Sequence, residues 1–192
     1  MYNIASLDQA VSFQLLIFPF HCSLSSLGNK TEKPALLDLV DKGLAQPFQS
    51  IKWPAGHAPT NFSRWRTSSQ PYSVEWAPNY EPYLVAKKEN LPSFDERFVG
   101  FGWNKVSFIM QLDAKNYKFF VHPSAFVMHM PHLPSLDLMR FRANSLYQTC
   151  LENFKLEFIN ELASKHGANA LKYLKAIPSS SKENDAPLKS RN

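Results

Sequence analysis

Residues 105–130, KVSFIMQLDAKNYKFFVHPSAFVMHM, decide the fold class, because a helical pattern runs directly into strand patterns. Residues 105–112 (KVSFIMQL) carry apolar side chains at helical spacing and predict a helix. Residues 117–122 (YKFFVH) and 125–130 (AFVMHM) are aromatic-rich runs that predict two strands. A chain that alternates helices and strands belongs to the α/β class, with its binding groups expected on the loops.

The upstream segments extend this alternation. Residues 13–20 form a short apolar run that predicts a buried strand, and residues 82–88 (PYLVAKK) predict another. Residues 33–42 predict a helix, which Gly43 ends by allowing a left-handed cap. Between them, residues 47–82 contain many prolines, glycines and aromatic residues, so we expect a long structured loop without regular helix.

The downstream segment predicts one long helix, from about Asp137 to His166, that Ser135 or Asp137 caps and Gly167 closes. Its apolar side chains recur every three or four residues and form one stripe. The stripe consists of Tyr147, Leu151, Phe154, Phe158 and Leu162. We expect this stripe to pack on the sheet.

Composition places the chain among globular proteins and excludes several functions. Of the 192 residues, 44% are hydrophobic and 14% aromatic, enough to bury a core, whereas residues 178–192 lack bulky apolar side chains and should be disordered. The longest apolar run, residues 10–20, is too short to span a membrane. The net charge of +5 suits anionic ligands, but no run of Lys and Arg predicts a nucleic-acid partner.

Two segments carry the candidate chemistry. Residues 94–105 (FDERFVGFGWNK) combine two glycines, aromatic residues and charges directly before a helix, where backbone N–H groups can face an anion; a tight packing loop with an exposed charge cluster is the alternative. His129 and His132 follow a predicted strand, so their imidazoles can converge on a divalent cation. The alternative for them is a structural role, and His57 gains no role from spacing.

Four motifs together resemble a known family. They are WPxGHAPTNFxRW (53–65), YEPY (80–83), DxRFVGFGWNK (95–105) and HMPH (129–132). In this order they are similar to the carboxy-terminal domain of the LARGE proteins, in glycosyltransferase family 49, to which a β-1,4-glucuronyltransferase also belongs. The resemblance divides the chain into a divergent segment with one expected strand (1–35), a partial glycosyltransferase domain (36–177) and the disordered tail (178–192).

The resemblance implies a GT-A fold, a Rossmann-like α/β domain that uses a UDP-sugar and Mn²⁺ in the Golgi lumen. Its reaction transfers glucuronate, with inversion, from UDP-glucuronate to a xylose-containing glycan of the dystroglycan type. The D-x-D motif that holds the metal and diphosphate in such enzymes is absent from the 192 residues. We therefore expect an incomplete, acceptor-side part of the domain. The alternative is a truncated, inactive paralogue or isoform that still binds glycans.

The resemblance also assigns roles to seven residues. His129, with His132 as the second choice, is expected to bind the metal. Asp95 and Glu96 are candidates for the carboxylate that accepts the proton of the acceptor hydroxyl. Lys105 is expected to pair with the donor's carboxylate, Asn104 to hydrogen-bond sugar hydroxyls and Trp103 to stack on a pyranose ring.

Overall fold

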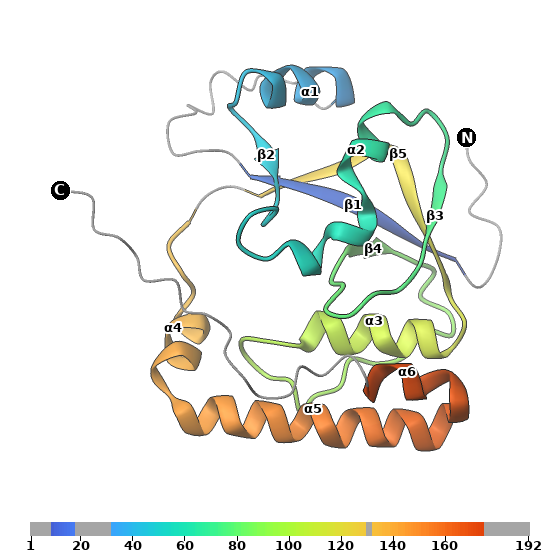
Figure 1. Ribbon diagram of the computed structural model, residues 1–192, viewed down its shortest axis with the longest axis vertical. Helices are drawn as coiled ribbons and strands as arrows, with labels where there is room; N and C mark the ends of the chain where they lie inside the picture. The colour runs from blue at the N-terminus through green and yellow to red at the C-terminus, as the bar shows by residue number, and fades with distance from the viewer. Residues whose placement is uncertain (1–8, 18–31, 130–131, 175–192) are drawn as a thin grey trace.

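The computed structural model describes residues 9–17, 32–129 and 132–174, which form a β-sheet with helices packed against it (Figure 1). The predicted disordered tail, 178–192, lies outside these residues. The elements in chain order are β1 (Gln9–Ile17), α1 (Lys33–Asp41), β2 (Gln46–Pro47), the 3₁₀ turns η2 (Pro54–Gly56) and η3 (Ala58–Thr60), α2 (Phe62–Thr67), β3 (Tyr72–Val74), β4 (Tyr83–Val85), α3 (Asn104–Ala114), β5 (Lys118–His129), α4 (Leu136–Ala143), α5 (Ser145–His166), η4 (Gly167–Ala170) and α6 (Leu171–Leu174).

The sheet is mixed, because it contains both parallel and antiparallel strand pairs. Its strand order is β2-β1-β5-β3, and β4 also pairs with β1. Strands β1 and β5 are parallel, whereas the β1–β2, β1–β4 and β3–β5 pairs are antiparallel. The strand expected at residues 13–20 overlaps β1, but residues 18–20 lie outside the described part of the chain. The predicted α/β class is therefore confirmed at the level of mixed helices and strands.

The two strands expected between residues 117 and 130 are one strand, β5, so that prediction was wrong in number. A β-bulge joins the two halves, because Ser12 pairs with Val121 while Gln14 pairs with Phe126. Inside the bulge the His122 ring nitrogen Nδ1 accepts hydrogen bonds from the backbone N–H groups of Ser124, at 3.3 Å, and Ala125, at 3.1 Å. Pro123, which has no N–H, fits within the bulge without breaking the strand.

The bulge also changes which residues of β5 face the core. Between the two pairings β1 advances by two residues and β5 by five, a difference of three. Because side chains alternate between the faces of a strand, an odd difference exchanges the faces. Val121 before the bulge and Phe126 and Met128 after it accordingly share one apolar cluster. His129, the next residue, lies on the opposite face.

Helix α3 lies between the sheet and α5, which forms an outer layer (Figure 1). On one side, Ile109 and Leu112 of α3 pack with Phe119 of β5. On the other, α3 presents Val106, Met110 and Ala114 to the stripe of α5 that contains Leu151, Phe158 and Leu162. The stripe was predicted to pack on the sheet, and this was wrong, because α3 occupies that face.

The single long helix predicted from Asp137 to His166 is two helices, α4 and α5, a second correction. Ser135 caps α4 through a hydrogen bond from the Leu138 N–H. Asn144 adopts an extended backbone, and its side-chain oxygen accepts from the Tyr147 N–H at 3.0 Å. Such an N-cap starts a new helix and ends the previous one. Gly167 ends α5 with a positive φ of 62°, as predicted.

Residues 47–82 contain more regular structure than the loop expected there. Helix α2 and strand β3 both lie in this segment, so the exclusion of helix was wrong. Residues 60–70 contain neither proline nor glycine, and Asn61 caps α2 by accepting a hydrogen bond from the Arg64 N–H. The fully buried Trp65 then anchors α2 against Leu36 of α1 and Val121 of β5.

Helix α1 matches its predicted range, and its first residue fastens it to two other elements. The Lys33 ammonium donates hydrogen bonds to the backbone carbonyls of Trp65, Ser68 and Pro123, at 2.5, 2.9 and 2.8 Å. It also lies 4.6 Å from the centroid of the Trp65 ring. Burial lowers the pKa of Lys33. One cation thus joins α1 to the end of α2 and to the bulge of β5.

Within the described residues, no helix combines the length and apolar character needed to cross a membrane.

Candidate functional site

The candidate site is built around the ammonium group of Lys105, in the first turn of α3. Its Nζ atom lies 3.8 Å from Oε2 of Glu81 and 4.5 Å from the centroid of the Tyr83 ring. The Lys105 side chain is 34% exposed and that of Glu81 is 24% exposed, so both charges are partly withdrawn from water. Two of the four sequence motifs, YEPY and the segment that ends in Asn104 and Lys105, therefore meet here.

The start of α3 positions Lys105. Trp103, the residue before the helix, has a left-handed backbone with φ of 63°. The side-chain oxygen of Asn104 accepts a hydrogen bond from the Lys105 N–H at 2.8 Å. Asn104, expected to bind sugar hydroxyls, thus uses its oxygen to order the first turn, and its amide group remains as a donor.

A row of rings brings in the other two motifs. Phe48 lies between His57 and His129, with ring centroids 5.0 and 4.9 Å away. The His129 and His132 centroids are 4.9 Å apart. The two predicted metal-binding histidines are therefore neighbours, and His57 joins them through Phe48.

The pKa values of His57 and His129 are both lowered in this environment. Burial, and then the charge of Lys105, lower the pKa of His57 to about 4. Burial lowers the pKa of His129, and the neighbouring His132 and Lys105 lower it further. His57 is thus neutral at physiological pH, and its buried Nε2 atom has no hydrogen-bond partner. Neutral imidazoles are the forms that bind metals or hydrogen-bond sugar hydroxyls.

Glu81 is held at the site by close packing. Its N–H donates to the Gly56 carbonyl at 3.0 Å. A Cβ at Gly56 would lie 2.5 Å from Cδ1 of Trp53 and 3.0 Å from Oε1 of Glu81, so glycine is what lets these groups come together. Burial raises the pKa of Glu81, against the opposing influence of Lys105 and the Trp53 indole N–H.

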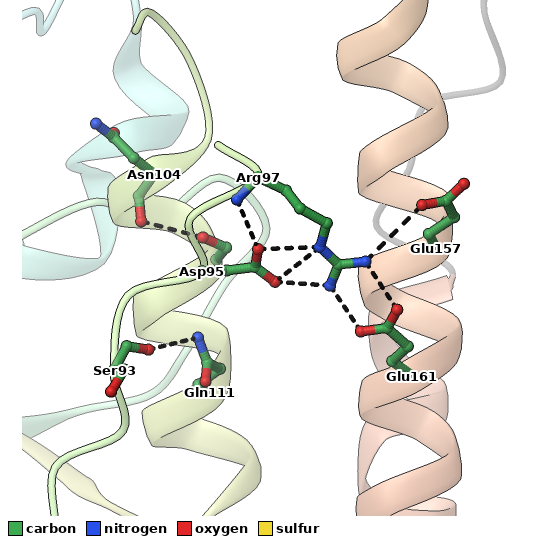
Figure 2. Close-up of polar contacts among 8 residues, drawn as sticks. Ser93, Asp95, Arg97, Asn104, Gln111, Glu157 and Glu161 are labelled. Carbon is green, nitrogen blue, oxygen red and sulfur yellow. Dashed lines mark hydrogen bonds and ion pairs between the residues drawn. The ribbon is translucent and has the colours of Figure 1, made fainter. Parts of the chain in front are cut away.

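The predicted site residue Asp95 lies in a different environment, an ion-pair network that faces α5 (Figure 2). The Arg97 guanidinium donates to Asp95, with Nη2 2.7 Å from Oδ2, and to both carboxylate oxygens of Glu161 on α5, at 2.7 and 2.6 Å. Glu157 lies 3.8 Å from the same guanidinium. The hydrogen bonds from Arg97 hold the pKa of Asp95 below its ordinary value. We call this set of four residues the Arg97 network.

The remaining predicted residues differ in exposure. Glu96 is exposed on the loop before α3. Trp103 packs with Phe98 and Phe158 at centroid distances of 5.8 and 6.4 Å, and the Lys155 ammonium lies 5.2 Å from its ring centroid. The Trp103 ring is thus part of the contact between α3 and α5.

The histidines meet only part of the requirement for a Mn²⁺ site. His132 Nδ1 donates to the Leu133 carbonyl at 2.7 Å, which leaves Nε2 as a potential metal ligand. Among the described residues, however, no three His, Cys, Asp or Glu side chains group closely enough to hold a metal. Mn²⁺ also favours oxygen ligands. The described residues therefore fit one or two ligands of such an ion but not a complete set.

Sequence reasoning missed His57 and Glu81. His57 is 48 positions before Lys105 and Glu81 is 24 before it, so no local spacing connects them to the candidate site. Their signal was membership in the motifs WPxGH and YEPY, which the family resemblance had already singled out. The pairing itself depends on the tertiary fold.

Comparisons with known proteins identify similar sequences. A family described as "Glycosyl-transferase for dystroglycan" matches residues 9–167. "Xylosyl- and glucuronyltransferase LARGE2s" of Danio rerio is 46% identical over 175 residues, which cover 91% of this chain and 23% of that protein. "Xylosyl- and glucuronyltransferase LARGE2" of Homo sapiens is 52% identical over 145 residues, 76% of this chain and 20% of that protein. The chain thus spans less than a quarter of the length of these curated relatives.

Proposed function

The chain belongs to glycosyltransferase family 49, the glycosyltransferases for dystroglycan, and from this membership we propose that it forms part of a GT-A domain that handles glucuronate. In this proposal the donor is UDP-glucuronate, the acceptor is a xylose-containing glycan of the dystroglycan type and the reaction inverts the anomeric carbon. The relatives' names, which state xylosyl and glucuronyl transfer, support this substrate class. We also propose a location in the Golgi lumen.

One observation carries the proposal: the Lys105 ammonium lies at the junction of motif residues. It lies 4.5 Å from the centroid of the Tyr83 ring and beside Glu81, and its charge adds to the effect of burial, which lowers the pKa values of His57 and His129. A partly buried cation next to aromatic and neutral imidazole rings suits a sugar that carries a carboxylate. The ammonium pairs with the acid while the rings contact the sugar's apolar face and hydroxyls.

The reaction needs a base and a stabilised leaving group. The acceptor hydroxyl oxygen attacks the anomeric carbon, the bond from that carbon to the UDP oxygen breaks and a carboxylate takes the hydroxyl proton. Of the two carboxylates expected for this step, Glu96 is the better base, because Arg97 pairs with Asp95 and lowers its pKa. His129 and His132 would supply part of the ligand set of Mn²⁺, whose chemical contribution would be positive charge near the leaving diphosphate.

Donor binding tests the role of Lys105. We expect the 192-residue chain to bind UDP-glucuronate more tightly than UDP-glucose in isothermal titration calorimetry. Lys105→Met should weaken UDP-glucuronate binding by about tenfold to a hundredfold and leave UDP-glucose unchanged, because a charge-assisted hydrogen bond is lost. Lys87→Met removes an exposed charge and serves as the control. Equal affinities for the two donors in the unaltered chain would refute the proposal.

Paramagnetic NMR tests the metal ligands without any turnover. Substoichiometric Mn²⁺ should broaden the ring C–H signals of His129 and His132 and spare those of His166, on the far helix α5. His129→Ala should abolish the broadening at His132, since removal of a ligand weakens retention of the metal. Equal broadening of all histidine signals would argue against a site at this position.

The absent D-x-D motif favours a second candidate, a glycan-binding protein without turnover. We expect the 192-residue chain alone not to transfer glucuronate to a xylose-terminated acceptor in the presence of UDP-glucuronate and Mn²⁺. The diphosphate would lack its aspartate-bound metal anchor. Measurable product by mass spectrometry would contradict this expectation and favour the active enzyme.

A further inference from the structure

Glu81 lies close enough to Lys105 to act on any anion that Lys105 binds. Its Oε2 atom is 3.8 Å from Nζ of Lys105, a distance that gives strong charge attraction but exceeds that of an ordinary hydrogen bond. The ammonium is at the same time drawn to the Tyr83 ring, 4.5 Å away. Glu81 therefore offsets the charge of Lys105 without enclosing it, and the ammonium keeps donors for a ligand.

The Glu81 carboxylate has little freedom to move aside. Gly56 leaves just enough room for it, since a Cβ there would lie 3.0 Å from Oε1 of Glu81. The backbone N–H of Glu81 is bonded to the Gly56 carbonyl, and Pro82, which follows, is buried. A ligand carboxylate bound to Lys105 would thus meet a second carboxylate that stays in place.

We propose that Glu81 tunes the specificity of this site for the charge of the ligand, so that it penalises a doubly charged phosphate more than a singly charged carboxylate. The inference rests on the proposed role of Lys105 in glucuronate binding. A ligand anion about 3 Å from Nζ lies within about 7 Å of Glu81. At that separation and an effective dielectric constant of 20 to 40, repulsion costs about tenfold or more in affinity.

Repulsion scales with ligand charge, so the proposal predicts two related numbers. If Glu81 weakens binding of a monoanion by about tenfold, it should weaken binding of a dianion in the same place by about a hundredfold. A neutral sugar should be unaffected. Glu81 thereby reduces the advantage in affinity that a sugar phosphate would have over an acidic sugar at an isolated ammonium.

Glu81→Gln is the direct test, because it keeps the shape of the side chain and an acceptor oxygen for the Trp53 indole N–H. Binding of glucuronate and of glucose 6-phosphate, each with its anion at C6, is measured by NMR titration at pH 7.5. We expect Glu81→Gln to tighten glucuronate binding by about tenfold and glucose 6-phosphate binding by about a hundredfold. Glu89→Gln, at an exposed position, matches the change in net charge and should alter neither affinity.

A second background separates this inference from the proposed function. In Lys105→Met the effect of Glu81→Gln on both ligands should shrink, because the ligand anion is no longer held beside position 81. If Glu81→Gln leaves the affinities unchanged or weakens them equally, Glu81 only positions Lys105 and the inference is wrong. If the unaltered chain does not prefer UDP-glucuronate to UDP-glucose, the proposed function itself fails and the inference with it.

Discussion

Lys33 and Arg97 both fasten a helix to distant segments, but they bind opposite kinds of partner. Lys33 donates to three neutral backbone carbonyls, whose positions follow from α2 and the β5 bulge. Arg97 donates to the carboxylates of Asp95 and Glu161, side chains that can move and can be protonated. The first connection is part of the backbone framework around the sheet, and the second ties the loop before α3 to the outer helix α5.

Because their acceptors differ, the two connections should respond differently to pH and to removal of the cation. Carbonyl acceptors keep their capacity at every pH, and they lose their partner completely when the cation is removed. Exposed carboxylates regain water when an ion pair breaks, so the loss is smaller. The side chains of Glu157 and Glu161 are 60% and 62% exposed, whereas that of Asp95 is 15% exposed. The Arg97 network should therefore contribute less to stability than Lys33 does.

The largest expected effect comes from the apolar contact that Arg97 supplements. Phe158, 4% exposed, packs against Phe98 and Trp103. Phe158→Ala should lower the free energy of unfolding by about 3 to 5 kcal/mol, measured by urea denaturation. Phe154→Ala on the same helix, where the ring is half-buried, should cost less. Equal losses would mean that α5 is not attached mainly through Phe158.

Lys33→Met should give the next largest effect. The methionine fills the space but cannot donate to the carbonyls of Trp65, Ser68 and Pro123, and we expect a loss of about 2 to 3 kcal/mol. Lys42→Met removes an exposed i,i+4 ion pair with Asp38 at the other end of α1 and should cost under about 0.5 kcal/mol. Equal losses of the free energy of unfolding in the two variants would show that Lys33 contributes no more than an exposed surface lysine.

Arg97→Met should cost about 1 to 2 kcal/mol, mostly because the partly buried Asp95 carboxylate loses its partner. Asp95→Asn in the Arg97→Met background should recover part of that loss, since it removes the unpaired charge. If Arg97→Met lowers the free energy of unfolding as much as Lys33→Met does, the exposure of the carboxylates does not make the Arg97 network the weaker connection.

The smallest effect is the dependence of these losses on pH. Arg97 holds the pKa of Asp95 below its ordinary value, so the stability from this pair is present above about pH 3.9 and is lost as pH falls through the lower pKa of the folded state. The penalty of Arg97→Met should therefore shrink from pH 6 to the acid end of the range. The penalty of Lys33→Met should stay constant there, because the lysine is protonated in both the folded and unfolded states. Parallel pH curves for the two variants would contradict this.

Local patterns predicted much of the fold and less of the site. The spacing of Leu151, Phe158 and Leu162 predicted a helix, because periodicity depends only on neighbouring residues. Their partner was missed, since nothing in that stripe distinguishes α3 from a sheet. The break at Asn144 was also missed. The capping hydrogen bond that Asn144 accepts from Tyr147 favours the break over a continued helix by only a small free energy, which the local sequence pattern does not show.

In the candidate site, too, local spacing predicted neighbours in sequence but not contacts across the fold. His129 and His132 were found together because they are three residues apart in the sequence, and the structure keeps their rings adjacent. The pairing of Lys105 with Glu81 requires two segments to meet across the fold, which no spacing encodes. Asp95 was chosen for its motif, although Arg97 two residues later was a local signal for an ion pair. The second partner of Arg97, Glu161, is 64 residues further on and could not be foreseen.

The β5 bulge makes the length of one short segment matter more than its composition. Met128 faces the core and His129 the opposite side because β5 has three more residues than β1 between the Ser12–Val121 and Gln14–Phe126 pairs. Loss or gain of a single residue at 122–125 would exchange the two, placing an imidazole among apolar side chains and a methionine beside Phe48. A one-residue insertion or deletion here in a relative should therefore be treated as a change in the candidate site and not as ordinary variation in loop length.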